Sequence, residues 1–160
     1  MPRARKGGPR DLSQSGDVPR TFKTATPDFD HTRMESMIPM RDGVKLFTVI
    51  MIPNDAGRKM PIVLTRTPYN AARRASRTDS PDIAMALPAV DEELVRNGYI
   101  RVYQDVRGRY GSKGEYTMTV PPIGDFNRGK VDQVSDAWDT VEWLVDNVPG
   151  NSGRVGITGV

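Results

Sequence analysis

The 160-residue sequence contains no cysteine and only one histidine, His31. Without cysteine the chain has no disulfide bonds, thiolate nucleophiles or cysteine-ligated metal sites of its own. His31 lies in a polar segment, where a lone histidine is typical of a solvated side chain and not of a catalytic base. Long apolar runs are also absent. The longest, residues 49–53, is strand-sized and too short to cross a bilayer, so we expect no membrane partner.

The positive charge is confined to one end of the chain. Residues 1–33 hold seven Lys or Arg and four Asp, so they carry the whole net charge of +3. They are rich in Pro, Gly, Ser and Thr, which predicts a disordered basic arm. The arm is either a solvated tail or a segment that wraps a neighbouring subunit. The neutral remainder predicts no nucleic-acid partner, and the lack of an apolar run near the start makes a cytoplasmic location the default expectation.

Residues 34–160 predict one partial α/β domain. Residues 34–40 and 44–53 read as two strands joined by a hairpin turn at Asp42-Gly43. Further strands are expected over residues 60–66, 99–104 and 153–159. The segments between them contain a short helix near residues 91–97, a break at Pro88, and a long helix over 132–148. This order predicts a mixed, mostly parallel sheet with flanking helices.

The helix over residues 132–148 carries an apolar stripe at helical spacing, with Trp143 on the opposite face. Its acidic residues lie away from the stripe or flank it, so we expect a solvated face. The stripe consists of Val134, Ala137, Trp138, Val141, Leu144, Val145 and Val148. The acidic set consists of Asp136, Asp139, Glu142 and Asp146. No second segment offers converging ligands, so no metal site is predicted.

The final strand is expected to be buried and to end at Gly159. In α/β-hydrolases a glycine at this position opens the Gly-x-Ser-x-Gly elbow that presents the nucleophile. Gly159 and Val160 would then be the first two residues of the elbow, and the nucleophile would follow Val160. The alternative is a glycine-rich strand end without chemistry.

Tyr69 is the one candidate catalytic residue in the chain. It follows the third expected strand in Thr67-Pro68-Tyr69-Asn70, where α/β-hydrolases place an oxyanion-hole donor that is normally a backbone N–H. Pro68 has no N–H, but the phenolic hydroxyl of Tyr69 could donate to a developing oxyanion. The alternative is an ordinary packed tyrosine beside a turn.

The glycine-dense segment from Asp105 to Gly114 follows the fourth expected strand. It lacks the order of residues that a phosphate-binding loop needs, so no nucleotide cofactor is predicted. We expect Asp105 and Arg107 to hold the loop together through a charge-assisted pair, while the glycines let the backbone turn.

Taken together, residues 41–44, 65–70, 98–112, 136–144 and 153–159 resemble the amino-terminal part of the α-amino acid ester hydrolases. These belong to the group of serine hydrolases that includes cocaine esterase and the X-prolyl dipeptidyl peptidases. The Asp-x-Arg-Gly loop and the Thr-Pro-Tyr segment are fairly specific to this group. The resemblance implies the amino-terminal half of an α/β-hydrolase fold, truncated at the nucleophile elbow, and implies that Tyr69 is an oxyanion-hole donor.

The resemblance also implies a Ser-Asp-His triad, whose members would all lie beyond Val160. The full-length enzyme is therefore expected to act on small-molecule esters or amides of α-amino acids, by hydrolysis or by acyl transfer. The acyl groups of β-lactams are included. That enzyme is expected to need no cofactor and to be a homo-oligomer, while this chain alone is expected to be inactive. The alternatives are a cocaine-esterase-like or X-prolyl dipeptidyl peptidase activity, or a non-catalytic binding or assembly module.

Overall fold

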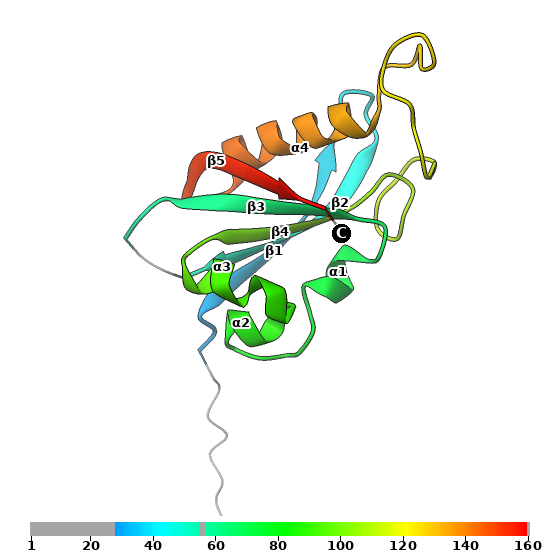
Figure 1. The fold of residues 1–160 in the computed structure, drawn as a ribbon. Helices are drawn as coiled ribbons and strands as arrows, with labels where there is room; N and C mark the ends of the chain where they lie inside the picture. The colour runs from blue at the N-terminus through cyan, green and yellow to red at the C-terminus, as the bar shows by residue number, and fades with distance from the viewer. Residues whose placement is uncertain (1–27, 55–56, 160) are drawn as a thin grey trace, which may run out of the picture.

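The computed structural model describes residues 28–54 and 57–159, which form a five-stranded mixed sheet in the order β1-β2-β4-β3-β5 (Figure 1). The strands are β1 (His31–Pro39), β2 (Lys45–Pro53), β3 (Met60–Thr67), β4 (Ile100–Asp105) and β5 (Asn151–Thr158). Strand β2 runs antiparallel to β1 and β4, whereas β3 runs parallel to β4 and β5. The predicted hairpin and the mixed sheet are thus confirmed.

The hairpin turn between β1 and β2 contains Asp42 and Gly43, as the sequence predicts. Gly43 has a φ of 85°, a left-handed conformation that glycine adopts without a Cβ clash. The strand before the turn begins at His31, earlier than the predicted start at residue 34. The expected arm of residues 1–33 therefore overlaps β1, and its residues 1–27 lie outside the described residues.

Helices cover both faces of the sheet (Figure 1). One face carries α1 (Ala71–Arg74), α2 (Ile83–Ala86), the 3-10 turn η2 (Ala89–Asp91) and α3 (Glu92–Arg96), and the other carries α4 (Gln133–Asn147). Pro88 separates α2 from α3, as predicted, because proline cannot continue a helix. The short helix α1 was not among the predicted elements.

The face of α4 that packs against the sheet is largely polar, so the predicted packing of this helix is wrong in part. Its buried residues are Ser135, Asp136, Thr140 and Leu144. Trp138, expected in the core, is 67% exposed, while Trp143 packs against the core on the α4 side. The helix is therefore rotated about its axis, so that part of its apolar stripe faces away from the sheet. Its polar face is held toward the sheet by buried polar partners on β4 and in the loops.

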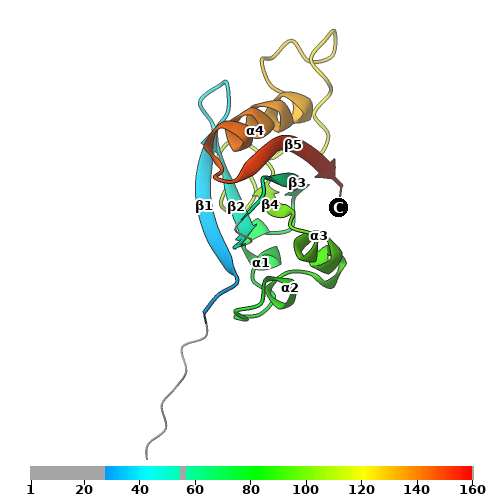
Figure 2. The same ribbon diagram turned by 90° about the vertical axis from the view of Figure 1, so that its left-hand side faces the viewer.

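Strand β5 forms one edge of the described sheet, and β1 forms the other (Figure 2). Strand β5 pairs with β3 in parallel, and its residue Ile157 is 54% exposed. The expected buried strand is thus largely open among the described residues. Among all the described residues, no helix has both the length and the apolar character that crossing a membrane requires.

Candidate active site

The carboxyl ends of the parallel strands β3, β4 and β5 lie side by side at one end of the sheet. The register pairs Thr67 at the end of β3 with Asp105 at the end of β4, and Thr65 with Thr158 of β5. The hydroxyls of Thr65 and Thr158 lie 2.7 Å apart, which fixes β5 against β3 near its end. Gly159 therefore leaves the sheet beside the turn that contains Tyr69, the edge where open α/β sheets bind ligands.

Tyr69 lies in this turn and is 63% exposed, so its phenol is accessible from outside the core. The backbone N–H of Tyr69 donates to the hydroxyl of Thr67, with 3.1 Å between the two atoms. That N–H is engaged and Pro68 has none, so within this Pro-Tyr pair only the phenolic hydroxyl remains as a donor. The geometry is compatible with the predicted donor, whose catalytic role stays a prediction.

Asn70 continues the turn in a conformation that few side chains adopt. Its φ is 67°, and its side chain accepts a hydrogen bond from the backbone N–H of Arg73 at 3.0 Å. Asparagine tolerates this left-handed conformation better than most residues. The capped helix α1 thereby fixes the exit of the chain from Tyr69.

Asp105 is buried and joins the Tyr69 turn to the glycine-dense loop. Its carboxylate accepts the backbone N–H of Ala71 at 2.7 Å and that of Gly111 at 3.1 Å. Burial raises the pKa of Asp105 above its ordinary value, although the two N–H groups and the charge of Arg109 oppose this shift. The predicted pair between Asp105 and Arg107 is wrong: Asp105 binds backbone amides instead.

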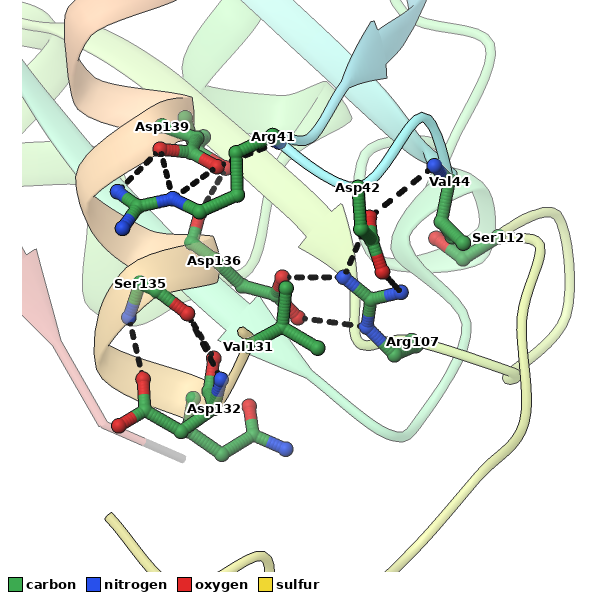
Figure 3. A network of polar contacts seen from close by, with 12 residues as sticks. Arg41, Asp42, Val44, Arg107, Ser112, Val131, Asp132, Ser135, Asp136 and Asp139 are labelled. Atoms are coloured by element: carbon green, nitrogen blue, oxygen red, sulfur yellow. Dashed lines mark hydrogen bonds and ion pairs between the residues drawn. The ribbon is translucent and has the colours of Figure 1, made fainter. Parts of the chain in front are cut away.

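Arg107 instead lies between two carboxylates (Figure 3). Its Nη1 lies 2.8 Å from Oδ2 of Asp42, and its Nη2 lies 2.6 Å from Oδ1 of Asp136. Arg66 approaches Asp136 as well, at 3.6 Å. Asp136 is 1% exposed, so the expectation of a solvated acidic face on α4 is wrong at this position. The arginine thus links the β1–β2 turn, the glycine-dense loop and α4.

Arg109 and Tyr110 of the same loop, and Tyr116 just beyond it, were not predicted as site residues. Nε of Arg109 donates to the carbonyl of Pro68 at 3.3 Å. Its guanidinium stacks on the rings of Tyr110 and Tyr116, at 5.2 Å and 4.9 Å from the ring centres. Sequence reasoning treated the loop as structural. The sequence signal that could have found it is the Arg109-Tyr110 pair between glycines. In the structure Tyr110 has a φ of 44°, a left-handed conformation that is uncommon for tyrosine.

His31, the single histidine, lies at the opposite end of the strands from Tyr69. It pairs with Pro53 of β2, and the nearby Met51 pairs with Arg101 at the start of β4. Its ring is close to buried, with 2.9 Å between Nδ1 and a carboxylate oxygen of Asp30. The expectation of a solvated side chain is therefore wrong, but His31 remains far from the carboxyl ends of the parallel strands.

Comparison with known proteins identifies the family of this chain. Residues 42–160 match the model of the X-Pro dipeptidyl-peptidase (S15) family, and the chain belongs to that family. Over 126 residues it is 36% identical to the cocaine esterase of Rhodococcus sp. (strain MB1 Bresler), covering 76% of this chain and 18% of the esterase.

Two solved structures resemble the described fold over nearly its whole length. An α-amino acid ester hydrolase labelled with selenomethionine shares 48% identity with a TM-score of 0.78, covering 94% of this chain and 24% of that one. An aminopeptidase from the marine sediment archaeon Thaumarchaeota archaeon shares 46% identity with a TM-score of 0.77, covering 93% and 24%. The predicted amino-terminal part of an α/β-hydrolase fold is thus confirmed, and the chain spans about a quarter or less of these relatives.

Proposed function

We propose that the whole protein is a serine hydrolase that acts on esters or amides of α-amino acids, β-lactam acyl groups included. The observation that carries this proposal is the similarity to the α-amino acid ester hydrolase over nearly the whole chain. The accessible phenol of Tyr69 at the carboxyl edge of the sheet supports the same chemistry. Membership of a hydrolase family supports the reaction class, and the substrate class is the part that this proposal adds.

The proposed mechanism is acyl transfer through a covalent intermediate. A serine presented by an elbow that begins at Gly159 attacks the substrate carbonyl, and a base takes the serine proton. The hydroxyl of Tyr69 donates to the oxyanion that develops in the tetrahedral intermediate. Collapse expels the alcohol or amine and leaves an acyl-enzyme, which water or an amine then attacks.

Residues 1–160 alone are expected to lack this activity. The mechanism needs a base near the nucleophile, and His31 lies at the other edge of the sheet, against Asp30. Purified chain incubated with a phenylglycine ester should show no turnover above the uncatalysed rate. Turnover that survives repurification and disappears in Tyr69→Phe would contradict this expectation.

A second candidate is an X-prolyl dipeptidyl peptidase or a cocaine-esterase-like activity, which the family match and the curated relative favour. The test is an assay of the protein expressed from its complete reading frame. Phenylglycine methyl ester, its N-acetylated form, an X-Pro anilide and a benzoyl ester are compared. We expect the free α-amino ester to have the highest kcat/KM. A clear preference for the anilide or the benzoyl ester would reject the proposed substrate class.

The reading frame itself provides an independent check of the mechanism. An in-frame Ser-Tyr-x-Gly directly after Val160 would complete the proposed elbow. A long unrelated sequence in its place would favour a binding or assembly module. A serine-directed reagent such as a fluorophosphonate should label the active protein and abolish its turnover.

A further inference from the structure

A cavity of about 490 Å³ lies between α1 and the start of η2. Its walls are formed by three arginines, a serine and two small apolar residues. The lining residues are Arg73, Arg74, Ser76, Arg77, Pro88 and Ala89. The volume is within the range of small-molecule sites, which is roughly 300–1,000 Å³. None of the described residues that line it is acidic.

The three arginines of this cavity have no carboxylate partner among the residues that the structure describes. Nε of Arg74 is buried and has no hydrogen-bond acceptor there. Several other described arginines do have carboxylate partners, as Arg101 has in Asp91 at 2.9 Å and Arg107 in Asp136 at 2.6 Å. A buried donor without an acceptor is costly, so Nε of Arg74 points to an acceptor that the described residues do not supply. The exposed guanidinium groups of Arg73 and Arg77 beside it favour an anion in that place.

On the α1 side of the cavity the available donors are side chains, because the backbone amides there are already engaged. The backbone N–H groups of Arg74 and Arg77 donate to the carbonyls of Asn70 and Ala86, and that of Ser76 donates to Arg73. The hydroxyl of Ser76 accepts from Nη1 of Arg33 at 2.7 Å, which leaves its own proton available to a ligand.

These features favour a carboxylate over a phosphate. Phosphate sites typically use free backbone N–H groups at helix N-termini or in backbone nests, and the amides of Arg74, Ser76 and Arg77 are already engaged. A guanidinium fork binds either anion through two parallel hydrogen bonds, so the engaged amides and the apolar wall decide between them. The side chains of Pro88 and Ala89 supply an apolar wall for an organic group attached to it.

We propose that the cavity lined by Arg73, Arg74 and Arg77 binds an organic carboxylate. The site lies on the helix whose cap, Asn70, directly follows Tyr69. Its assignment depends only on the cavity and its unpaired arginines, and it holds whether or not the protein hydrolyses α-amino acid esters.

The test is a titration of the full chain with benzoate, benzamide and inorganic phosphate at constant ionic strength. Nε–Hε resonances of the arginines are followed by NMR. Benzoate should shift the Arg74 signal saturably, whereas neutral benzamide, of nearly the same shape, should not. Arg74→Gln and Arg77→Gln should each raise the Kd for benzoate about tenfold, because each removes charge-assisted hydrogen bonds. Arg128→Gln, which removes an exposed arginine of another loop, should leave it unchanged.

A second variant guards against a folding defect in Arg74→Gln. Arg74→Lys retains the charge but not the fork, so it should fold normally by circular dichroism and still bind benzoate more weakly than wild type. Equal losses in Arg128→Gln and Arg74→Gln would show non-specific attraction and overturn the proposal. Tighter binding of phosphate than of benzoate, or equal shifts from benzamide, would overturn it as well.

Discussion

Arg107 holds Asp136 through two hydrogen bonds, with 2.6 Å between Nη2 and Oδ1 and 3.1 Å between Nε and Oδ2. Asp136 is on the face of α4 that packs against the sheet, and Arg107 belongs to the loop after β4. This pair therefore fastens the only helix on its side of the described sheet to the loop that borders the candidate site. The same arginine also binds Asp42 in the hairpin turn.

Removing the Arg107 side chain should destabilise the protein strongly. Arg107→Met leaves the carboxylate of Asp136 buried, with Arg66 at 3.6 Å as its remaining cation. Breaking a buried ion pair from one side typically costs about 3–5 kcal/mol, and we expect the lower end because Arg66 remains. Urea denaturation followed by circular dichroism measures the free energy of unfolding.

The matched control for this prediction is Arg96→Met. Arg96 is on the surface, where it pairs with Glu92 and Asp82. Exposed ion pairs contribute about 0–1 kcal/mol, so this variant should unfold close to wild type. Similar losses in the two variants would mean that Arg107 contributes no more than an ordinary surface arginine.

Asp105→Ala should weaken the connection between the Tyr69 turn and the glycine-dense loop. The substitution removes the acceptor of two N–H groups, that of Ala71, which is buried, and that of Gly111, which is partly buried. Each unsatisfied buried donor costs about 1–3 kcal/mol. Hydrogen exchange should quicken at both amides in the variant, whereas Asp125→Ala, in an exposed loop, should leave them unchanged. Unaltered protection at Ala71 would contradict the role assigned to Asp105.

The pH dependence of stability should include a contribution from Asp139. The hydrogen bonds from Arg41 hold the pKa of this carboxyl below its ordinary value of 3.8. A lowered pKa in the folded state gives stability that is present above the unfolded pKa and is lost as pH falls through the folded one. The difference in Tm between wild type and Asp139→Asn should therefore be constant above about pH 5 and shrink below about pH 4.

Asp146→Asn is the control for this titration, because Asp146 is an exposed aspartate on the same helix. Its difference from wild type should be small throughout the range. A difference for Asp139→Asn that grows as the pH falls would contradict the sign derived from its pKa.

The sequence predicted the order and type of most elements because these depend on local signals. Asp42-Gly43 set the hairpin, Pro88 separated α2 from α3, and the spacing of apolar residues identified α4. The rotation of α4 could not be predicted in the same way. It depends on Gln104, whose amide lies 2.9 Å from the hydroxyl of Thr140, and on the Arg107–Asp136 pair. In such pairs, buried polar groups from segments distant in sequence satisfy one another's hydrogen bonds. The spacing of apolar residues carries no information about these contacts.

The candidate site was predicted only in part for a related reason. Its position at the end of β3 followed from the strand pattern, and the turn at Pro68 and Tyr69 lies there. The prediction paired Asp105 with Arg107, because opposite charges near in sequence suggested an ion pair. In the structure the loop turns between them, so that Asp105 faces backbone amides and Arg107 faces Asp136.

The open edge of β5 should cause residues 1–160, produced alone, to self-associate. Ile157 is 54% exposed there, and the outer side of β5 pairs with no other strand of the described chain. Exposed apolar edges are templates for pairing with other chains, and lysine on an edge strand opposes it. Ile157→Lys should therefore shift the sedimentation profile toward monomer.

Val90→Lys is the control for this effect, because Val90 is 80% exposed but lies in η2, away from β5. It should leave the association unchanged. A wild-type chain that sediments as a monomer and unfolds cooperatively in calorimetry would contradict the prediction.

Tyr69→Phe, made in the protein expressed from its complete reading frame, tests the catalytic role proposed for this residue. The phenol is exposed, and the adjacent backbone N–H already donates to Thr67. If the hydroxyl donates to the oxyanion, its loss should lower kcat by about 10²–10³, roughly 3–4 kcal/mol, with a smaller change in KM. The fold should tolerate the change because only one oxygen is lost. Tyr99→Phe, at the residue directly before β4, is the matched control and should retain kcat. Equal unfolding curves for both variants, with a near-normal kcat for Tyr69→Phe, would mean that Tyr69 is not the oxyanion donor.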